Sequence, residues 1–257
     1  MKKMIYPLLL AFLVVACGNK SQNTDKENKT MAFALTDYHE VFKIGDNQET
    51  KADAVIPIAE GDSDAAKKIN DKVFETIKLI VSLEEDSSTN YNELFLGFIK
   101  SYKEFVSETP DYTQAWTVDI KGEVEYNSLE LINIKLESFM MTGGAHGNPY
   151  TASLIFDAKE GKALSVSDLV NDTTALNVLA EAKFREKYNI PTDKSLNSTG
   201  LMFVDDKFIL PANIFVTKDG LLLFYNVYEI APYVAGTKDI LIPYTEIDKI
   251  LSAKIKQ

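Results

Sequence analysis

The spacing of apolar residues changes at Asp111, and this change constrains the fold more than any other feature. Segments 64–83 and 91–108 repeat their apolar residues at helical intervals and predict two amphipathic helices. Beyond Asp111, apolar and polar residues alternate as in strands with one buried face, and Trp116 is expected in the core. Helices that lead into runs of antiparallel strands predict an α+β fold, in which antiparallel sheets pack against helices.

The second half of the chain repeats this order of elements. Lys218-Asp-Gly220 separates two apolar runs and predicts a tight hairpin in which Gly220 supplies a positive φ. The pattern therefore indicates two interlocked α+β modules, 31–148 and 149–257. Strands are expected at 129–141, 150–156, 214–217, 221–225 and 239–242, and helices at 174–188 and 244–255.

The amino terminus is typical of an export signal. Lys2 and Lys3 precede an apolar run at 5–16, and small residues then lead to Cys17. This run fits a signal-peptide core of about 7–15 residues and is shorter than the roughly 20 that a bilayer-spanning helix needs. The arrangement resembles the lipobox of bacterial lipoproteins, which implies that 1–17 is a signal peptide and that Cys17 is lipidated. The alternative is an ordinary secretory signal with an incidental cysteine.

Residues 18–30, GNKSQNTDKENKT, carry no large apolar side chain and predict a flexible tether. A flexible coil of this length spans about 20 Å, so the folded part would lie close to the membrane that holds the lipid. Gly18 is not the aspartate that retains lipoproteins in the inner membrane. By analogy with other lipoproteins, we expect an outer-membrane position, with the face of that membrane left open.

The chain is acidic, with a formal net charge of −11. Without Lys2 and Lys3 the 27 basic residues become 25 against 38 acidic ones, which gives −13. No cluster of basic residues interleaved with aromatics is present, so nucleic acid is not expected as a partner. The charge favours a cationic partner, or it serves only to keep the protein soluble.

Few residues are available for metal or nucleophilic chemistry. The chain holds two histidines and one cysteine, whereas a metal site needs several converging ligands. No G-x-S-x-G elbow and no G-K-[ST] phosphate loop occurs, so a serine triad and a Walker-type site are not expected. We therefore expect no catalytic residue, no metal and no cofactor.

The stretch TGGAHGNPY, residues 142–150, is interpreted as a turn. Gly143, Gly144 and Gly147 allow left-handed or closely packed backbone, and Pro149 forces its predecessor into an extended conformation. His146 then has two possible roles. Its ring either holds the turn through a hydrogen bond to a backbone carbonyl or a carboxylate, or it lines a ligand groove.

Together with YNVYEIAPYVAG at 225–236 and IPY at 242–244, this stretch resembles two extracytoplasmic families of unknown function, 4163 and 3298. The first would cover about 31–148 and the second about 163–251. Relatives with these modules sense lysozyme as the ectodomain of an anti-sigma factor, or accompany a peptidoglycan deacetylase domain. The resemblance implies a non-catalytic module of the cell envelope that binds or senses a ligand.

Two functions of different class remain open. The first is binding of a peptidoglycan fragment or of a cationic protein such as lysozyme. The second is a hydrolase or deacetylase-type enzyme acting on cell-wall glycan, with His146 and Glu229 as acid and base. The candidate ligand contacts are Gly143, Gly144, His146, Tyr228, Glu229 and Tyr233.

Overall fold

The structure is a computed structural model that describes residues 29–44, 48–83 and 85–255. Cys17, the signal peptide and most of the tether lie outside these residues, so their assignments stay predictions. Over the described ranges, every helix is too short or too polar to cross a membrane. The strands are β1 (Phe33–Ile44), β2 (Gln48–Ala59), β3 (Thr117–Asn127), β4 (Leu131–Met141), β5 (Asn148–Asp157), β6 (Asn213–Val216), β7 (Gly220–Tyr225) and β8 (Lys238–Pro243). The α-helices are α1 (Asp64–Val81), α2 (Tyr91–Glu108), α3 (Val166–Leu169), α4 (Thr173–Lys187) and α5 (Tyr244–Ile247).

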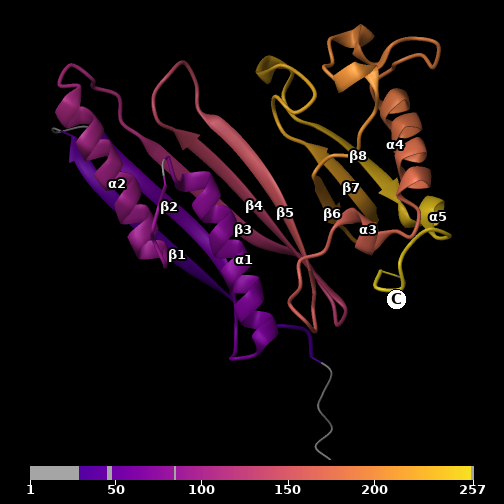
Figure 1. Cartoon of the computed structure of the whole chain (residues 1–257), viewed down its shortest axis with the longest axis horizontal. Coiled ribbons are helices and arrows are strands. Elements are labelled where there is room, and N and C mark those ends of the chain that lie inside the picture. Colours follow the sequence, from indigo (N-terminus) through magenta and orange to yellow (C-terminus); the bar gives the residue numbers. More distant parts are fainter. Residues whose placement is uncertain (1–28, 45–47, 84, 256–257) are drawn as a thin grey trace, which may run out of the picture.

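The first sheet has the order β1-β2-β3-β4-β5, and α1 and α2 cover one of its faces (Figure 1). All neighbouring strands are antiparallel except β2 and β3, which pair in parallel. The parallel pair arises because the chain passes through both helices before it enters β3, and such a crossover returns the chain in the same direction. The α+β fold predicted from the sequence is confirmed.

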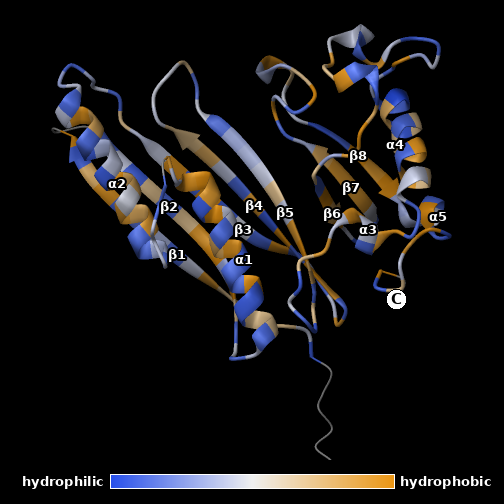
Figure 2. Ribbon diagram, in the orientation of Figure 1, coloured by the Kyte–Doolittle hydropathy of each residue, from blue (hydrophilic) through white to orange (hydrophobic). Residues whose placement is uncertain are grey.

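Both helices begin at capping residues and bury one apolar face. The Ser63 side chain accepts the N–H of Ala66, and the Asn90 side chain accepts the N–H of Glu93. Their apolar faces pack on buried side chains of the sheet, and Figure 2 shows orange segments along both helices and on the strands that they cover. Trp116, 6% exposed, lies in this core as predicted.

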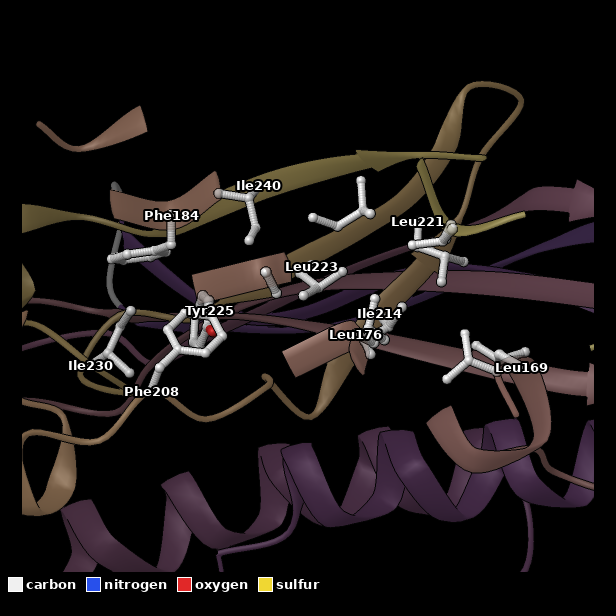
Figure 3. Close-up of a cluster of buried hydrophobic side chains, with 14 of the residues drawn as sticks. Leu169, Leu176, Phe184, Phe208, Ile214, Leu221, Leu223, Tyr225, Ile230 and Ile240 are labelled. Atoms are coloured by element: carbon white, nitrogen blue, oxygen red, sulfur yellow. The ribbon is translucent and has the colours of Figure 1, made fainter. Parts of the chain in front are cut away.

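The second sheet, β6-β7-β8, packs with α4 around a separate group of buried side chains (Figure 3). Phe184 of α4 and Tyr225 of β7 are fully buried there, with their ring centroids 5.9 Å apart. Leu131 and Ile155, from the first sheet, belong to the same group. The two sheets therefore share side chains where they meet.

Three features differ from the sequence-based expectation. The β1–β2 hairpin, which forms one edge of the first sheet, was not expected. The expected helix 244–255 ends at Ile247, because the backbone at Ile250 and Ser252 instead bonds to Asn171 and Leu169. The hairpin at Lys218-Asp-Gly220 forms, but Gly220 is not left-handed: a Cβ there would lie 2.1 Å from the carbonyl oxygen of Ile242, so glycine is needed for close approach.

Buried amide side chains join the two sheets along β5, a strand that begins at Asn148 and pairs with β4 along its length. Asn133 accepts the N–H of Val216 at 2.8 Å, and Asn213 accepts that of Ser153 at 2.9 Å. Asn226 accepts the N–H of Thr151 at 2.8 Å and donates to its carbonyl at 2.9 Å. We refer to Asn133, Asn213 and Asn226 as the amide seam.

Candidate functional site

Residues 142–147 form the bend between β4 and β5, as the sequence predicts. Gly143 and Gly144 have φ values of +110° and +87°, which favour glycine because it carries no Cβ. Gly147 has a different reason: a Cβ there would lie 2.1 Å from the ring of Phe139. The glycines thus serve both uses expected of them, left-handed backbone and close packing.

A second loop, residues 226–236, lies against this bend. Ile230 and Ala231 are buried in the second core and hold the middle of the loop (Figure 3). Tyr228 is left-handed, with a φ of +67°, and its side chain is 54% exposed. A large residue in this conformation is uncommon and requires the surrounding structure to maintain it.

The rings of His146, Tyr228 and Tyr233 meet where the two loops touch. The His146 and Tyr233 rings stack, with centroids 4.0 Å apart and an interplanar angle of 18°. Tyr228 lies 5.6 Å from Tyr233 and 6.4 Å from His146. The Tyr233 hydroxyl donates to the carbonyl of Gly147 at 3.2 Å. We call these three residues the ring cluster.

The hydrogen bonds of His146 define its neutral tautomer. Its Nδ1 lies 2.9 Å from the carbonyl oxygen of Gly147, which can only accept, so Nδ1 carries the proton. Nε2 then accepts from the Tyr228 hydroxyl at 3.3 Å. The His146 ring is exposed. Within the described part of the chain, its two hydrogen bonds go to the Gly147 carbonyl and the Tyr228 hydroxyl. This matches the interpretation in which the ring holds the turn.

Glu229 does not reach His146 in this arrangement. Its carboxylate accepts the backbone N–H of Asn226 at 2.8 Å, and its own N–H donates to the Asn226 carbonyl at 3.2 Å. The structure therefore brings together His146, Tyr228 and Tyr233, with Gly143 and Gly144 in the adjoining bend. Glu229 lies beside them and stabilises the loop, and the acid and base pairing of His146 with Glu229 is not formed.

The histidine that does contact a carboxylate was not singled out from the sequence. Nδ1 of His39 lies 2.5 Å from Asp53, and Lys51 also donates to Asp53, at 2.8 Å. Burial raises the pKa of Asp53, but the bonds from Lys51 and His39 outweigh it and leave this pKa below its ordinary value. The strand register pairs His39 with Asp53 directly, and only knowledge of that pairing would have revealed the contact.

Acidic and histidine side chains do not gather into a metal site in the part of the chain that the structure describes. No group of three or more His, Cys, Asp or Glu residues there is close enough to hold an ion. The ring cluster offers one imidazole and two phenols, which is not a donor set typical of zinc. What the cluster presents to solvent is flat apolar surface with polar edges.

Two family models match separate parts of the chain. The family described as a protein of unknown function, DUF3298, matches residues 167–245. The family described as deacetylase PdaC matches residues 44–149. The predicted resemblance to family 3298 is confirmed over its part of the chain, whereas family 4163 stays a prediction. His146 lies in the PdaC match, and Tyr228 and Tyr233 lie in the DUF3298 match.

Solved structures of DUF3298 proteins share the fold. One from Bacteroides fragilis NCTC 9343 has a TM-score of 0.66 and 20% identity, over 87% of this chain and 94% of that chain. One from Pseudomonas aeruginosa PAO1 has a TM-score of 0.61 and 17% identity, over 89% and 97%. At these identities the similarity concerns the fold alone. No curated protein matches the chain.

Proposed function

We propose that this chain, with a PdaC-like region at 44–149 and a DUF3298 region at 167–245, is a non-catalytic binding module of the bacterial cell envelope. The two regions relate it to cell-wall modules. In this proposal a lipid on Cys17 holds the protein at a membrane. The ring cluster contacts the ligand, either a peptidoglycan fragment or a cationic protein such as lysozyme.

The observation that carries the proposal is the composition and exposure of the ring cluster. His146 and Tyr233 stack at 4.0 Å, and Tyr228 beside them is 54% exposed. Rings held in one orientation lose little entropy on binding and offer both an apolar face and a polar edge. Among the described residues, the hydrogen bonds of His146 go to the Gly147 carbonyl and the Tyr228 hydroxyl, so the arrangement suits contact better than proton transfer.

The position of the cluster fits a protein anchored by its amino terminus. Asn127 donates to the carbonyl of Met31 at 2.8 Å, so the described chain starts beside the turn between β3 and β4. The bend that carries His146 follows the other end of β4. Ten residue steps at about 3.3 Å separate the two ends of this strand by roughly 33 Å. The first described residues and the bend lie at opposite ends of the sheet in Figure 1.

The test is a calorimetric titration of the purified chain with lysozyme and with muropeptides. We expect one of them to bind, and Tyr228→Ala and Tyr233→Ala to weaken that binding about tenfold, or about 1.4 kcal/mol. Leu79→Ala is the matched control, since Leu79 is a large exposed side chain on α1, away from the cluster. Absence of binding to both probes would contradict the proposal, and turnover of a muropeptide that is lost in His146→Ala would replace it with the enzyme.

The anchor needs its own test, because the ring cluster gives no information on Cys17. Mass spectrometry of the chain purified from bacterial membranes should find acyl chains on Cys17. Cys17→Ser should release the protein from the membrane fraction, because two or more acyl chains make such anchoring stable. An unmodified Cys17 in membrane-bound protein would contradict this part of the proposal.

A further inference from the structure

We propose that the loop around 196–206 extends the ring cluster into a docking surface for a folded protein that offers an apolar hollow edged by basic side chains. The surface consists of Met202, Val204, Tyr228 and Val234, and we call it the apolar tip. This inference rests on the proposed function, since Tyr228 belongs to both sites. It goes further in its residues and in choosing a folded protein over a glycan fragment.

The side chains of the apolar tip protrude into solvent. Val234 is 93% exposed and Val204 is 72% exposed, and Met202 is also more than half exposed. The N–H of Met202 donates to the carbonyl of Ile230 at 2.8 Å, which ties the two loops together. The turns around 196–206 and 233–235 lie at the same end of the second sheet in Figure 1. Neighbouring apolar side chains that are this exposed commonly mark an interaction site.

Both loops are held in fixed conformations. Asn197 bonds both the N–H and the carbonyl of Phe203, at 2.8 and 2.9 Å, and Phe203 is itself buried. Asp205 and Asp206 have φ values of +54° and +57°, so the chain turns sharply directly after Val204. Backbone of this kind persists only where its surroundings maintain it. The exposed side chains are therefore presented by ordered loops.

The second loop is fixed by a lysine. The ammonium group of Lys238 contacts the carbonyl oxygens of Ala235, Gly236 and Thr237. These contacts occupy the amine within its own loop, immediately after Val234. An ordered apolar contact loses less conformational entropy on binding than a mobile one, which favours affinity.

Shape decides between a small ligand and a protein. Small molecules bind in concave sites that bury most of their surface. A side chain that is 93% exposed, as Val234 is, becomes buried only when a partner supplies the hollow. Folded proteins offer such hollows at their interfaces, and flexible glycan fragments do not.

The charge of the apolar tip favours a protein partner over a membrane surface. Segments 201–207 and 228–235 hold three carboxylates, Asp205, Asp206 and Glu229, against one basic residue, Lys207. The whole chain carries −11, so an anionic lipid surface is repelled. A partner with Lys or Arg around an apolar hollow complements this tip.

The test compares Val204→Asp and Val234→Asp with Val178→Asp in the full chain. Val178 is an exposed valine on α4 outside the two loops, so it controls for adding a charge to an exposed apolar position. Calorimetry uses lysozyme as a folded cationic probe, at about 0.15 M and about 1 M salt, where the Debye length falls from about 8 to about 3 Å. Vesicles with phosphatidylglycerol and a muropeptide are the other probes.

We expect both tip variants to weaken lysozyme binding at least about tenfold at both salt concentrations, with Val178→Asp unchanged. Circular dichroism should show the same folded spectrum for all variants. If the tip variants bind lysozyme as the original chain does while Tyr233→Ala does not, the apolar tip is wrong and the proposed function stands. Binding to vesicles or to the muropeptide that depends on Val234, without lysozyme binding, would overturn the choice of a folded protein. If no probe binds, both proposals fail.

Discussion

Two of the contacts between the halves of the described chain are built from different kinds of side chain. The amide seam consists of asparagines that are at most 7% exposed, and it bonds the backbone of β5 and β6. The ring cluster consists of a histidine and two tyrosines at the surface, and it joins the bend after β4 to the loop after β7. One contact is shielded from water and the other faces it.

Because of this difference, the amide seam should matter for stability and the ring cluster for ligand recognition. A buried amide that loses its partner leaves polar groups without hydrogen bonds, at about 1–3 kcal/mol for each group. An exposed ring that loses its partner is hydrated again at little cost. The seam is therefore suited to hold the sheets together, and the ring cluster can exchange its contacts for those of a ligand. Substitutions in the seam should therefore lower stability more than substitutions in the ring cluster do.

Asn133→Ala should reduce the free energy of unfolding by about 3 kcal/mol or more. Asn133 is fully buried, and its amide accepts from Val216 and donates to Ser153 and Leu154. Removal of the amide leaves more than one of these groups unpaired and opens a small cavity. Urea denaturation followed by circular dichroism measures the change.

The control for this variant is Asn92→Ala. Asn92 is exposed in the first turn of α2, so its replacement should change the free energy of unfolding by no more than about 0.5 kcal/mol. Equal effects of the two substitutions would show that the seam does not carry the stability assigned to it.

Gly147→Ala should cost about 1–2 kcal/mol, because the new Cβ would lie 2.1 Å from the ring of Phe139 and force this partly exposed ring aside. Gly97→Ala in α2 is the opposite control. Its Cβ meets nothing closer than 3.6 Å, so this variant should gain up to about 1 kcal/mol in helix propensity. Thermal unfolding should show a lower melting temperature for Gly147→Ala and a higher one for Gly97→Ala.

A double substitution sharpens this result. In chains that already carry Phe139→Ala, the cost of Gly147→Ala should fall by about 1 kcal/mol or more, since the clashing ring is gone. An unchanged cost would place the origin of the strain elsewhere in the bend.

Local patterns were sufficient for most of the helices and strands. The periodicity of α1, α2 and α4 and the alternation of β3 follow from which face each element buries, whereas β4 and β6 were marked by runs of apolar residues. The hairpin of β1 and β2 was missed because β1 has no buried residue and carries three charged residues, Asp37, Glu40 and Lys43, as exposed edge strands often do. Its fold depends on tertiary contacts such as those of Tyr38 and Phe42 with the rings of α2.

The site was predictable in part. Glycines and a histidine between apolar runs marked the bend, and the tyrosines marked the second loop. Which rings stack, and that Glu229 turns back to Asn226, depend on contacts between residues about 80 positions apart or on loop geometry. Met202 and Val204 were not singled out, because the sequence does not show that an apolar side chain points outward.

Asp157 makes a smaller contribution to the free energy of unfolding, and this contribution depends on pH. Burial raises its pKa, but hydrogen bonds from Lys254 and from the N–H groups of Glu160 and Lys159 outweigh burial and leave the pKa below 3.8. The stabilisation of the folded state by Asp157 is therefore fully present at pH values above the ordinary pKa of an aspartate. It is lost as the pH falls through the lower pKa that Asp157 has in the folded state. Asp157→Asn should cost about 1 kcal/mol at pH 7.

The same variant should show a flatter dependence on acid. Between about pH 4 and pH 2, the original chain should lose more of its free energy of unfolding than Asp157→Asn does. Urea midpoints measured across this range provide the comparison. Parallel curves for the two proteins would show that other carboxylates, and not this contact with the C-terminal segment, set the acid sensitivity.

His146→Ala should have the smallest effect on stability, below about 1 kcal/mol, although it removes a stacked ring and two hydrogen bonds. The ring is exposed, so water replaces the lost bonds to Gly147 and Tyr228. Binding of the ligand should fall in the same variant, because the stacked face of Tyr233 loses its support. Thermal unfolding and calorimetry on one preparation measure both quantities. If His146→Ala instead unfolds the chain as readily as Asn133→Ala does, then the ring cluster is a second structural seam, and ligand recognition must reside in other residues.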